Sequence, residues 1–207
     1  MKVILVNGSP DRHGCTATAL AEVAAALERE GIETEMFHIG VKPISGCLGC
    51  GRCRESGRCF IDDCVNDFIE RAASADGFVF GSPVYFASVN GAMTAFMDRV
   101  FYAAPREMFF MKPAAAVASA RRAGTTVTLD QLNKYFMITQ MPIVSSQYWN
   151  MVHGNTPDEV RQDLEGLQIM RTLGKNMAYM LRCLEAGRAA GVPLPAREAR
   201  VATNFIR

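Results

Sequence analysis

Four cysteines lie close together in the segment CLGCGRCRESGRC, which spans residues 47–59. The first three follow the spacing C-x2-C-x2-C, and the glycines beside them allow the backbone to turn tightly. Thiolates at this spacing are typical of a [4Fe–4S] cluster. Cys59 follows Cys53 after five residues, where the bacterial ferredoxin run has three, and Gly57 lets the longer loop close. The spacing therefore predicts a cluster held by Cys47, Cys50, Cys53 and Cys59.

Two other uses of these thiols stay open. Zinc also binds cysteine, but the consecutive spacing is crowded for a tetrahedral ion. The cysteines could instead form a loop of reduced or disulfide-bonded thiols that covers an active site. The chain has seven cysteines, too unevenly placed for the disulfide framework of a secreted protein, so we expect a cytoplasmic protein.

A second group of residues could hold a phosphate. An apolar, β-branched run at 3–6 stops at Asn7-Gly8-Ser9-Pro10, and a helical pattern begins near Thr16. A strand, a tight loop and a helix N-terminus together bind anions through backbone N–H groups and the helix dipole. Five residues separate Gly8 from Gly14 and no Lys follows, so this is not a P-loop, and the dinucleotide fingerprint fails as well. The hydroxyls of Ser9 and Thr16 and the cation of Arg12 suit a monophosphate such as that of FMN; an ordinary strand-to-helix turn is the alternative.

Two further loops follow predicted strands. Gly81-Ser82-Pro83-Val84-Tyr85-Phe86 places two aromatic rings at a strand end, where a planar flavin ring would cover them. Packing of those rings on a helix or on another subunit is the alternative. The segment Ser119–Thr125 (SARRAGT) adds hydroxyls, a glycine and two arginines before a helix, and could equally be a solvated turn.

These loops need a sheet to bring them together. Five strand candidates alternate with five helical segments, which predicts an α/β fold with a doubly wound, five-stranded parallel sheet and right-handed crossovers. Ligands of such sheets bind beyond the carboxyl ends of the strands, where all three loops would lie. The expected strands are 3–6, 34–39, 77–81, 111–119 and 142–145, and the expected helices are 16–29, 63–73, 92–102, 125–139 and 156–186. No linker is visible, so residues 1–207 form one predicted domain, with a Cys-rich insertion at about 44–63 and a C-terminal arm at about 188–207.

The composition excludes some classes of protein. A net charge of +1 and a pI near 7.6 over 207 residues argue against a nucleic-acid or membrane-surface binder. No apolar run approaches the ~20 residues that span a bilayer, and the N-terminus enters a strand without a signal-peptide pattern.

Taken together, the motifs resemble those of the flavodoxin-like NADPH-dependent FMN reductases, in the branch that includes iron–sulfur flavoproteins. The resemblance rests on GSPDRHGCT, the Cys run with Asp62-Asp63, GSPVYFASVNGAMTAFMDR and SARRAGTT, in family order through Met180. It implies FMN bound by the three loops. The implied contacts are Ser9, Arg12, Gly14, Cys15 and Thr16 for the phosphate, Pro83, Val84, Tyr85 and Phe86 for the ring, and Ser119, Arg121, Arg122, Gly124 and Thr125 for the remainder.

Two positions depart from the family's usual phosphate loop. Asp11 stands where a basic residue is common, and Cys15 stands where Asn is common. A carboxylate would repel a phosphate dianion, so we expect Asp11 to point away and Arg12 to be the side-chain partner.

The sequence thus predicts an FMN-dependent oxidoreductase that passes electrons from NAD(P)H to a quinone, nitro, azo or flavin acceptor. No residue pair is identified as a catalytic acid and base. Two alternatives stay open: an iron–sulfur flavoprotein that carries electrons with a ferredoxin-type partner, and a thiol redox sensor. The resemblance and the aromatic segment 145–153 also predict a homodimer or homotetramer.

Overall fold

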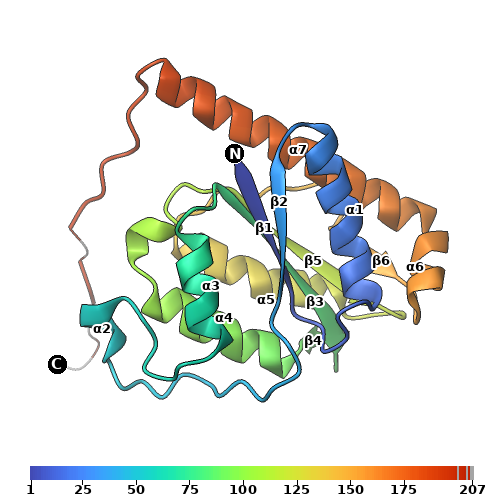
Figure 1. Ribbon diagram of the computed structural model, residues 1–207, viewed down its shortest axis with the longest axis horizontal. Helices are drawn as coiled ribbons and strands as arrows, with labels where there is room; N and C mark the ends of the chain where they lie inside the picture. Colours follow the sequence, from blue (N-terminus) through green and yellow to red (C-terminus); the bar gives the residue numbers. More distant parts are fainter. Residues whose placement is uncertain (200, 204, 206–207) are drawn as a thin grey trace.

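The computed structural model describes residues 1–199, 201–203 and 205, and its centre is a twisted parallel sheet (Figure 1). The strands follow the order β2-β1-β3-β5-β6, and each neighbouring pair is parallel. A two-residue strand, β4 (Ser88–Val89), pairs antiparallel with the end of β3. The predicted doubly wound, five-stranded parallel sheet is confirmed. Its strands are β1 (Lys2–Asn7), β2 (Glu33–His38), β3 (Gly77–Tyr85), β5 (Ala114–Ala120) and β6 (Met151–His153).

Helices cover both faces of this sheet (Figure 1). One face packs against α1 and α7, and the other against α3, α4 and α5. Side chains of β1 alternate between the two cores, with Val3 and Leu5 on the α1–α7 side and Ile4 and Val6 opposite, as the pleat of a strand requires. The helices are α1 (Cys15–Arg29), α2 (Cys53–Ser56), α3 (Cys64–Ala72), α4 (Gly91–Ala103), α5 (Thr125–Ile138), α6 (Pro157–Gln162) and α7 (Leu164–Ala189), with a short 3-10 turn at Arg106–Met108.

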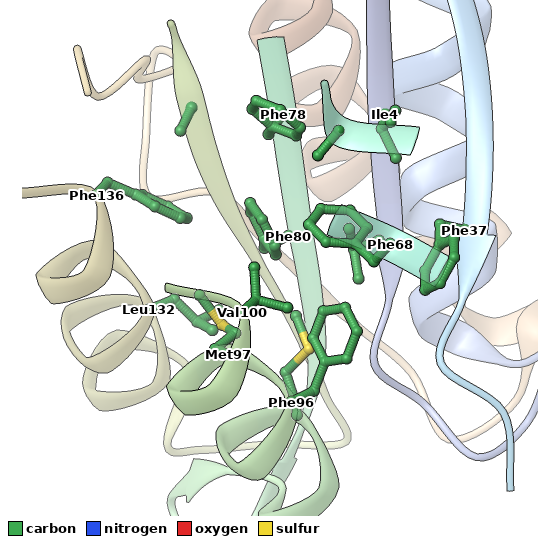
Figure 2. Close-up of a cluster of buried hydrophobic side chains, with 14 of the residues drawn as sticks. Ile4, Phe37, Phe68, Phe78, Phe80, Phe96, Met97, Val100, Leu132 and Phe136 are labelled. Atoms are coloured by element: carbon green, nitrogen blue, oxygen red, sulfur yellow. The ribbon is translucent and has the colours of Figure 1, made fainter. Parts of the chain in front are cut away.

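The core beneath α3 and α4 contains seven buried phenylalanines, six of which are labelled in Figure 2. Phe68 of α3 lies at its centre, with ring centroids 5.2 Å from Phe37, 5.3 Å from Phe96 and 5.9 Å from Phe80, each pair edge-on. Edge-to-face contacts add to the burial of such large rings and fix their orientation. This core anchors the two helices that flank the Cys-rich insertion.

The fifth strand was predicted in the wrong place. Residues 142–145 form only an isolated bridge, between Ile143 and Ala114, and the edge strand is Met151–His153. The chain pairs with the start of β5 through Val144, whose N–H donates to the Ala114 carbonyl at 2.8 Å. It then loops out and returns at Asn150, whose carbonyl accepts from the Ala118 N–H at 3.0 Å. Two short contacts thus replace the one predicted strand.

The predicted helix over 156–186 is two helices. Thr156 caps α6 and Asp163 caps α7, each accepting a backbone N–H three residues on. Asp163 also accepts from the His153 N–H at 2.6 Å, which ties the break between the helices to the end of β6. Local capping by Asp163 therefore interrupts an otherwise helical pattern.

The remaining differences are small. The Cys-rich insertion carries the one-turn helix α2, and the other helices and strands begin or end a few residues from their expected bounds. Of the predicted arm, residues 188–189 finish α7, the following described residues have no regular structure, and residues 200, 204, 206 and 207 lie outside the described part. Within the described part of the chain, no helix has both the length and the apolar character needed to cross a bilayer.

Candidate functional site

The three predicted loops meet at the carboxyl edge of the sheet. The Gly8 N–H donates to the Gly81 carbonyl at 2.8 Å, and the Asn90 side chain donates to the Gly8 carbonyl at 2.6 Å. The hydroxyls of Thr16 and Ser119 are hydrogen-bonded at 2.7 Å. Loops more than one hundred residues apart in sequence therefore form one surface.

The first loop is held in shape by Asn7, the last residue of β1. Its Oδ1 accepts from the Ser9 N–H at 3.0 Å, and its Nδ2 donates to the carbonyls of Asp11 (3.4 Å) and Arg12 (3.5 Å). His38 adds a 2.8 Å contact from Nε2 to the Ser9 carbonyl. Asn7 is fully buried, and the sequence reasoning missed it. Its one signal is a polar residue at the end of an apolar strand.

Backbone N–H groups at the start of α1 are left open to an anion. Gly14 is the N-cap residue in extended conformation (φ −77°, ψ −167°), and no side chain caps the helix. A Cβ on Gly14 would lie 3.0 Å from Asp11 Oδ2, because the Asp11 carboxylate folds back over its own loop and accepts the His13 N–H at 2.9 Å. Arg12 is exposed, and its guanidinium has no hydrogen-bond partner within the described residues.

Two of the hydroxyls predicted at the phosphate, those of Ser9 and Thr16, form hydrogen bonds that brace the loops. Ser9, Thr16 and Ser119 are all buried, and Ser9 Oγ accepts from the Asp11 N–H at 3.1 Å. Burial raises the pKa of the Cys15 thiol, which donates to the Gly154 carbonyl at 3.6 Å. These side chains hold the first loop against β5 and against the loop after β6.

The second loop ends in a strained aromatic hairpin. Tyr85 pairs with Ser88, so Phe86 and Ala87 form a two-residue turn, with φ of +50° and +58°. Turns of this kind prefer Asn-Gly, because L side chains resist positive φ at both positions. Phe86 is 104% exposed. An exposed aromatic ring on a strained turn indicates that this hairpin serves a purpose other than stability.

The third loop packs closely against that hairpin at Gly124. Gly124 has a φ of +92°, and a Cβ there would lie 2.6 Å from the Ala87 Cα. Only glycine allows this close approach. Thr125 is buried beside Met151, whereas Arg121 and Arg122 are exposed. Pro83 and Val84 lie half-buried in the part of β3 that leads to the turn.

A cleft of about 330 Å³ lies between the first two loops and the segment that follows β2. Its walls include Pro10, Tyr85 and residues 40–44. The segment 40–44 continues directly into the Cys-rich insertion, which runs below α3 and α4 toward α2 (Figure 1). One face of the predicted flavin site is therefore built by the chain that carries the cysteines.

The four cysteines line one pocket together with Phe60, Arg99 and Tyr102. Cys47 and Cys50 are exposed, Cys59 is partly buried and Cys53 is buried. Burial raises the pKa of Cys53, and the nearby thiols of Cys59, Cys47 and Cys50 raise it further. In the described part of the chain, no group of three His, Cys, Asp or Glu side chains is arranged to hold a single metal ion.

Arg99 of α4 is the main residue of this pocket that the sequence reasoning missed. Its side chain is only 1% exposed and forms an ion pair with Asp63 at 2.6 Å. Its one signal is a cation within the apolar helix segment GAMTAFMDRVFYA. Cys64, next to Asp63, is a fifth cysteine nearby; burial raises its pKa to about 11, so its thiol stays protonated.

Comparison with known proteins bears on both halves of this site. A family model described as NADPH-dependent FMN reductase matches residues 1–156. The chain belongs to this family. It is therefore an FMN-binding, flavin reductase-like oxidoreductase, as the resemblance predicted.

Relatives of this chain include an iron-sulfur flavoprotein of Methanocaldococcus jannaschii. That protein is 33% identical over 195 residues, which cover 89% of this chain and 100% of the relative. Among solved structures, RosB with bound 8-demethyl-8-formylriboflavin-5′-phosphate has a TM-score of 0.68 at 15% identity, covering 100% of this chain and 94% of RosB. A flavodoxin, WrbA-like protein from Agrobacterium tumefaciens has a TM-score of 0.60 at 16% identity, covering 88% and 98%. The fold is flavodoxin-like.

The residues present fit the cofactor of an FMN reductase. The uncapped N-terminus of α1 and Arg12 supply donors and positive charge for a phosphate. The cleft beside Tyr85 lies within the size range of small-molecule sites. The cysteines of the second pocket supply four sulfur donors, as a [4Fe–4S] cluster requires.

Proposed function

We propose that this protein passes electrons from NAD(P)H through bound FMN to a small acceptor: a quinone, a nitro or azo compound, or a free flavin. The observation that carries the proposal is the meeting of three loops at one sheet edge, with open helix N–H groups at one end and exposed aromatic rings at the other. Bound FMN supplies the redox chemistry, by accepting a hydride and releasing electrons.

The chain's own residues bind and orient that cofactor. The first-turn N–H groups of α1 and the Arg12 guanidinium hold the phosphate, and the strained hairpin at Phe86 lies beside the ring. The buried hydroxyl pair of Thr16 and Ser119 fixes the first and third loops relative to each other. No protein acid or base is assigned to the reaction, because hydride transfer to a flavin needs orientation more than proton transfer.

Stopped-flow reduction of the purified protein tests the proposal. We expect flavin absorption bands that bleach within seconds on mixing with NADPH or NADH, and that return when a quinone is added. A protein that binds no FMN, or whose FMN neither nicotinamide reduces, would contradict it.

A second candidate function is an electron carrier, in which the FMN and a [4Fe–4S] cluster exchange electrons with a ferredoxin-type partner. Four cysteines around one pocket, two of them exposed, favour it, as does the full-length match to an iron-sulfur flavoprotein. α4 begins beside the flavin loops and reaches the Cys pocket at Arg99 and Tyr102, ~12–17 Å further along at ~1.5 Å per residue.

Anaerobic purification separates the two candidates. About four irons and four sulfides per chain, together with faster reduction by reduced ferredoxin than by NAD(P)H, would favour the carrier. Iron-free protein with rapid NAD(P)H oxidation would favour the reductase. Iron-free protein whose activity depends instead on disulfide formation among Cys47, Cys50, Cys53 and Cys59 would favour a thiol sensor.

We also propose a homo-oligomer, a dimer or a tetramer. Tyr148 and Trp149 meet edge-on, with 4.6 Å between their ring centroids, and both are more than half exposed. Large exposed aromatic side chains are typical of interfaces. Light scattering after size exclusion would give the mass, and a monomer at micromolar concentration would refute the proposal.

A further inference from the structure

Arg99 is buried at the centre of the Cys-rich insertion, and each of its N–H groups has an acceptor. Nε donates to Cys59 Sγ at 3.2 Å. One terminal nitrogen donates to Asp63 Oδ2 (2.6 Å) and the Ser45 carbonyl (3.4 Å), and the other to Asp63 Oδ1 (2.9 Å) and the Ile61 carbonyl (2.8 Å). A guanidinium carries five N–H donors, so all of them are used.

The orientation of this guanidinium is set by Asp63. The carboxylate takes both terminal nitrogens in a fork, which leaves the Nε–H directed at the sulfur of Cys59. Asp63 is itself fixed, because its Oδ1 also accepts from the Val65 N–H as the N-cap of α3. One carboxylate therefore connects α3, α4 and the Cys-rich insertion.

The backbone of Cys59 is held as firmly as its side chain. Asn66 of α3, 2% exposed, accepts the Cys59 N–H at 2.8 Å and donates to the Cys59 carbonyl at 3.0 Å. Cys47 and Cys50 are exposed and carry no side-chain hydrogen bond in the described structure. Of the four predicted ligands, Cys59 is the one whose sulfur is fixed by a charged donor.

A buried ion pair is weak evidence for stability, because the free energy needed to remove the charges from water offsets much of their electrostatic attraction. The placement of Arg99 therefore calls for another explanation. Hydrogen bonds to the ligand sulfurs are one of the means by which a protein sets the potential of an iron–sulfur cluster. A cationic donor stabilises the reduced form, which carries more negative charge, and so raises the potential.

We propose that Arg99 is a positioning residue for the cluster: it holds the Cys59 sulfur as the fourth ligand and raises the reduction potential through its Nε–H. This inference rests on the proposed [4Fe–4S] cluster. Asp63 acts through Arg99 by fixing the direction of the guanidinium, and Asn66 acts by fixing the backbone of Cys59.

Two variants and one control test it. Arg99→Lys keeps a positive charge beside Asp63 but loses the planar fork, and Arg99→Met loses both. Arg58→Met is the matched control, because Arg58 lies in the same insertion but is 52% exposed and pairs with the exposed carboxylates of Asp62 and Glu70. FMN content and far-UV ellipticity establish that each variant is folded.

In anaerobically reconstituted protein we expect Arg99→Lys to retain iron. Its reduction equilibrium, measured by dithionite titration, should shift at least tenfold toward the oxidised cluster, which lowers the reduction potential by about 59 mV for one electron. We expect Arg99→Met to hold less than half of the wild-type iron, and Arg58→Met to match the wild type in both measurements. Wild-type iron content and potential in both Arg99 variants would overturn the proposal and leave the proposed function standing.

Hydrogen exchange of the iron-free protein tests the positioning of Cys59 separately from the cluster. We expect the amides of residues 57–63 to exchange at least tenfold faster in Arg99→Met than in the wild type or in Arg58→Met. Unchanged exchange would overturn the positioning role. If the wild type takes up no iron, the cluster fails, and faster exchange would still support the placement of Cys59 by Arg99.

Discussion

Arg12 supplies the positive side-chain charge of the proposed phosphate loop, because Asp11 turns back on its own loop and the Cys15 thiol bonds to Gly154. We expect Arg12→Ala to weaken FMN binding about fivefold, or about 1 kcal/mol. This is less than a buried charge-assisted hydrogen bond contributes, because Arg12 is exposed to solvent. Flavin fluorescence titration of the apoprotein measures this. Arg29→Ala, at the other end of α1, is the control and should bind FMN as the wild type does. Equal affinity in both variants would mean that backbone N–H groups hold the phosphate without Arg12.

Cys64 lies beside the Cys-rich pocket with a strongly raised pKa. Its pKa of about 11, caused first by burial and then by the charge of Asp63, keeps the thiol neutral at physiological pH. We expect iodoacetamide to modify Cys64 of iron-free protein slowly at pH 8, and faster as the pH approaches 11. Mass spectrometry of peptides after timed alkylation gives the rate, with the exposed Cys183 as the internal control. Rapid modification of Cys64 at pH 7 would contradict the assignment.

Among single residues, the sequence identified those whose side chains suggest chemistry but not those that hold them in position. The cysteines and the loop glycines were identifiable because their spacing is local. Asn7, Asn90 and Arg99 were not, because each acts on a partner that only the fold brings near. Ser9, Thr16 and Ser119 were identified as polar loop residues, but their burial and the hydrogen bond between Thr16 and Ser119 could not be foreseen.

Among the elements, the β3–β4 hairpin is where local preference and structure conflict most. Ala87 has a φ of +58° at the second turn position, where glycine is preferred. We expect Ala87→Gly to raise the free energy of unfolding by about 0.5–1 kcal/mol, seen as a higher urea midpoint. A destabilised variant would show that the Ala87 methyl group contributes packing that outweighs the backbone strain.

Phe86 beside it should behave differently. Its ring is fully exposed, so Phe86→Ala should leave the urea midpoint unchanged within about 0.5 kcal/mol and alter FMN binding or acceptor turnover instead. Comparison of the two single variants separates backbone strain from the function of the ring. A large loss of stability in Phe86→Ala would place the ring in the folded core.

The elements themselves were predictable wherever a pattern was long. Periodic apolar residues gave α1 and α5 to within a residue or two, and short apolar runs gave the three central strands. β6 was not predictable, because it has only three residues and is defined by its pairing with β5, a contact that only the fold creates. The break before α7 depends on Asp163 meeting His153, which is again a contact across the fold.

For the whole molecule, the dependence of stability on pH is influenced by a cluster of charged side chains near the amino end of β1, away from the three loops. Glu35 of β2 accepts from Lys2 of β1 at 2.6 Å and from Arg71 of α3 at 2.7 Å, so three elements meet there. The hydrogen bond from Lys2, then that from Arg71, lowers the pKa of Glu35 below 4.5, and Glu35 raises the pKa of Lys2 above 10.5. The contribution of Glu35 is therefore fully present above pH 4.5 and is lost as the pH falls below it.

We expect Glu35→Gln to lower the free energy of unfolding by about 1 kcal/mol at pH 7, the upper end for a solvent-accessible pair. The difference from the wild type should shrink as the pH falls below 4.5. Urea unfolding followed by far-UV ellipticity at pH 7 and at pH 3.5 measures both. Glu33→Gln is the control, because Glu33 is 71% exposed and lies 3.9 Å from Lys2. A difference that is equal at both pH values would refute the assignment.

The distribution of aromatic residues has a practical consequence for such measurements. The buried rings of the core are phenylalanines, and the single tryptophan, Trp149, is 57% exposed on the loop before β6. In a single folded chain its indole already meets water, so in a monomer its emission should change little on unfolding and would underreport the transition. Flavin absorbs where tryptophan emits, so the same residue should instead lose intensity when FMN binds. Trp149 is therefore an intrinsic optical probe of FMN binding, and its emission should change little when a single chain unfolds.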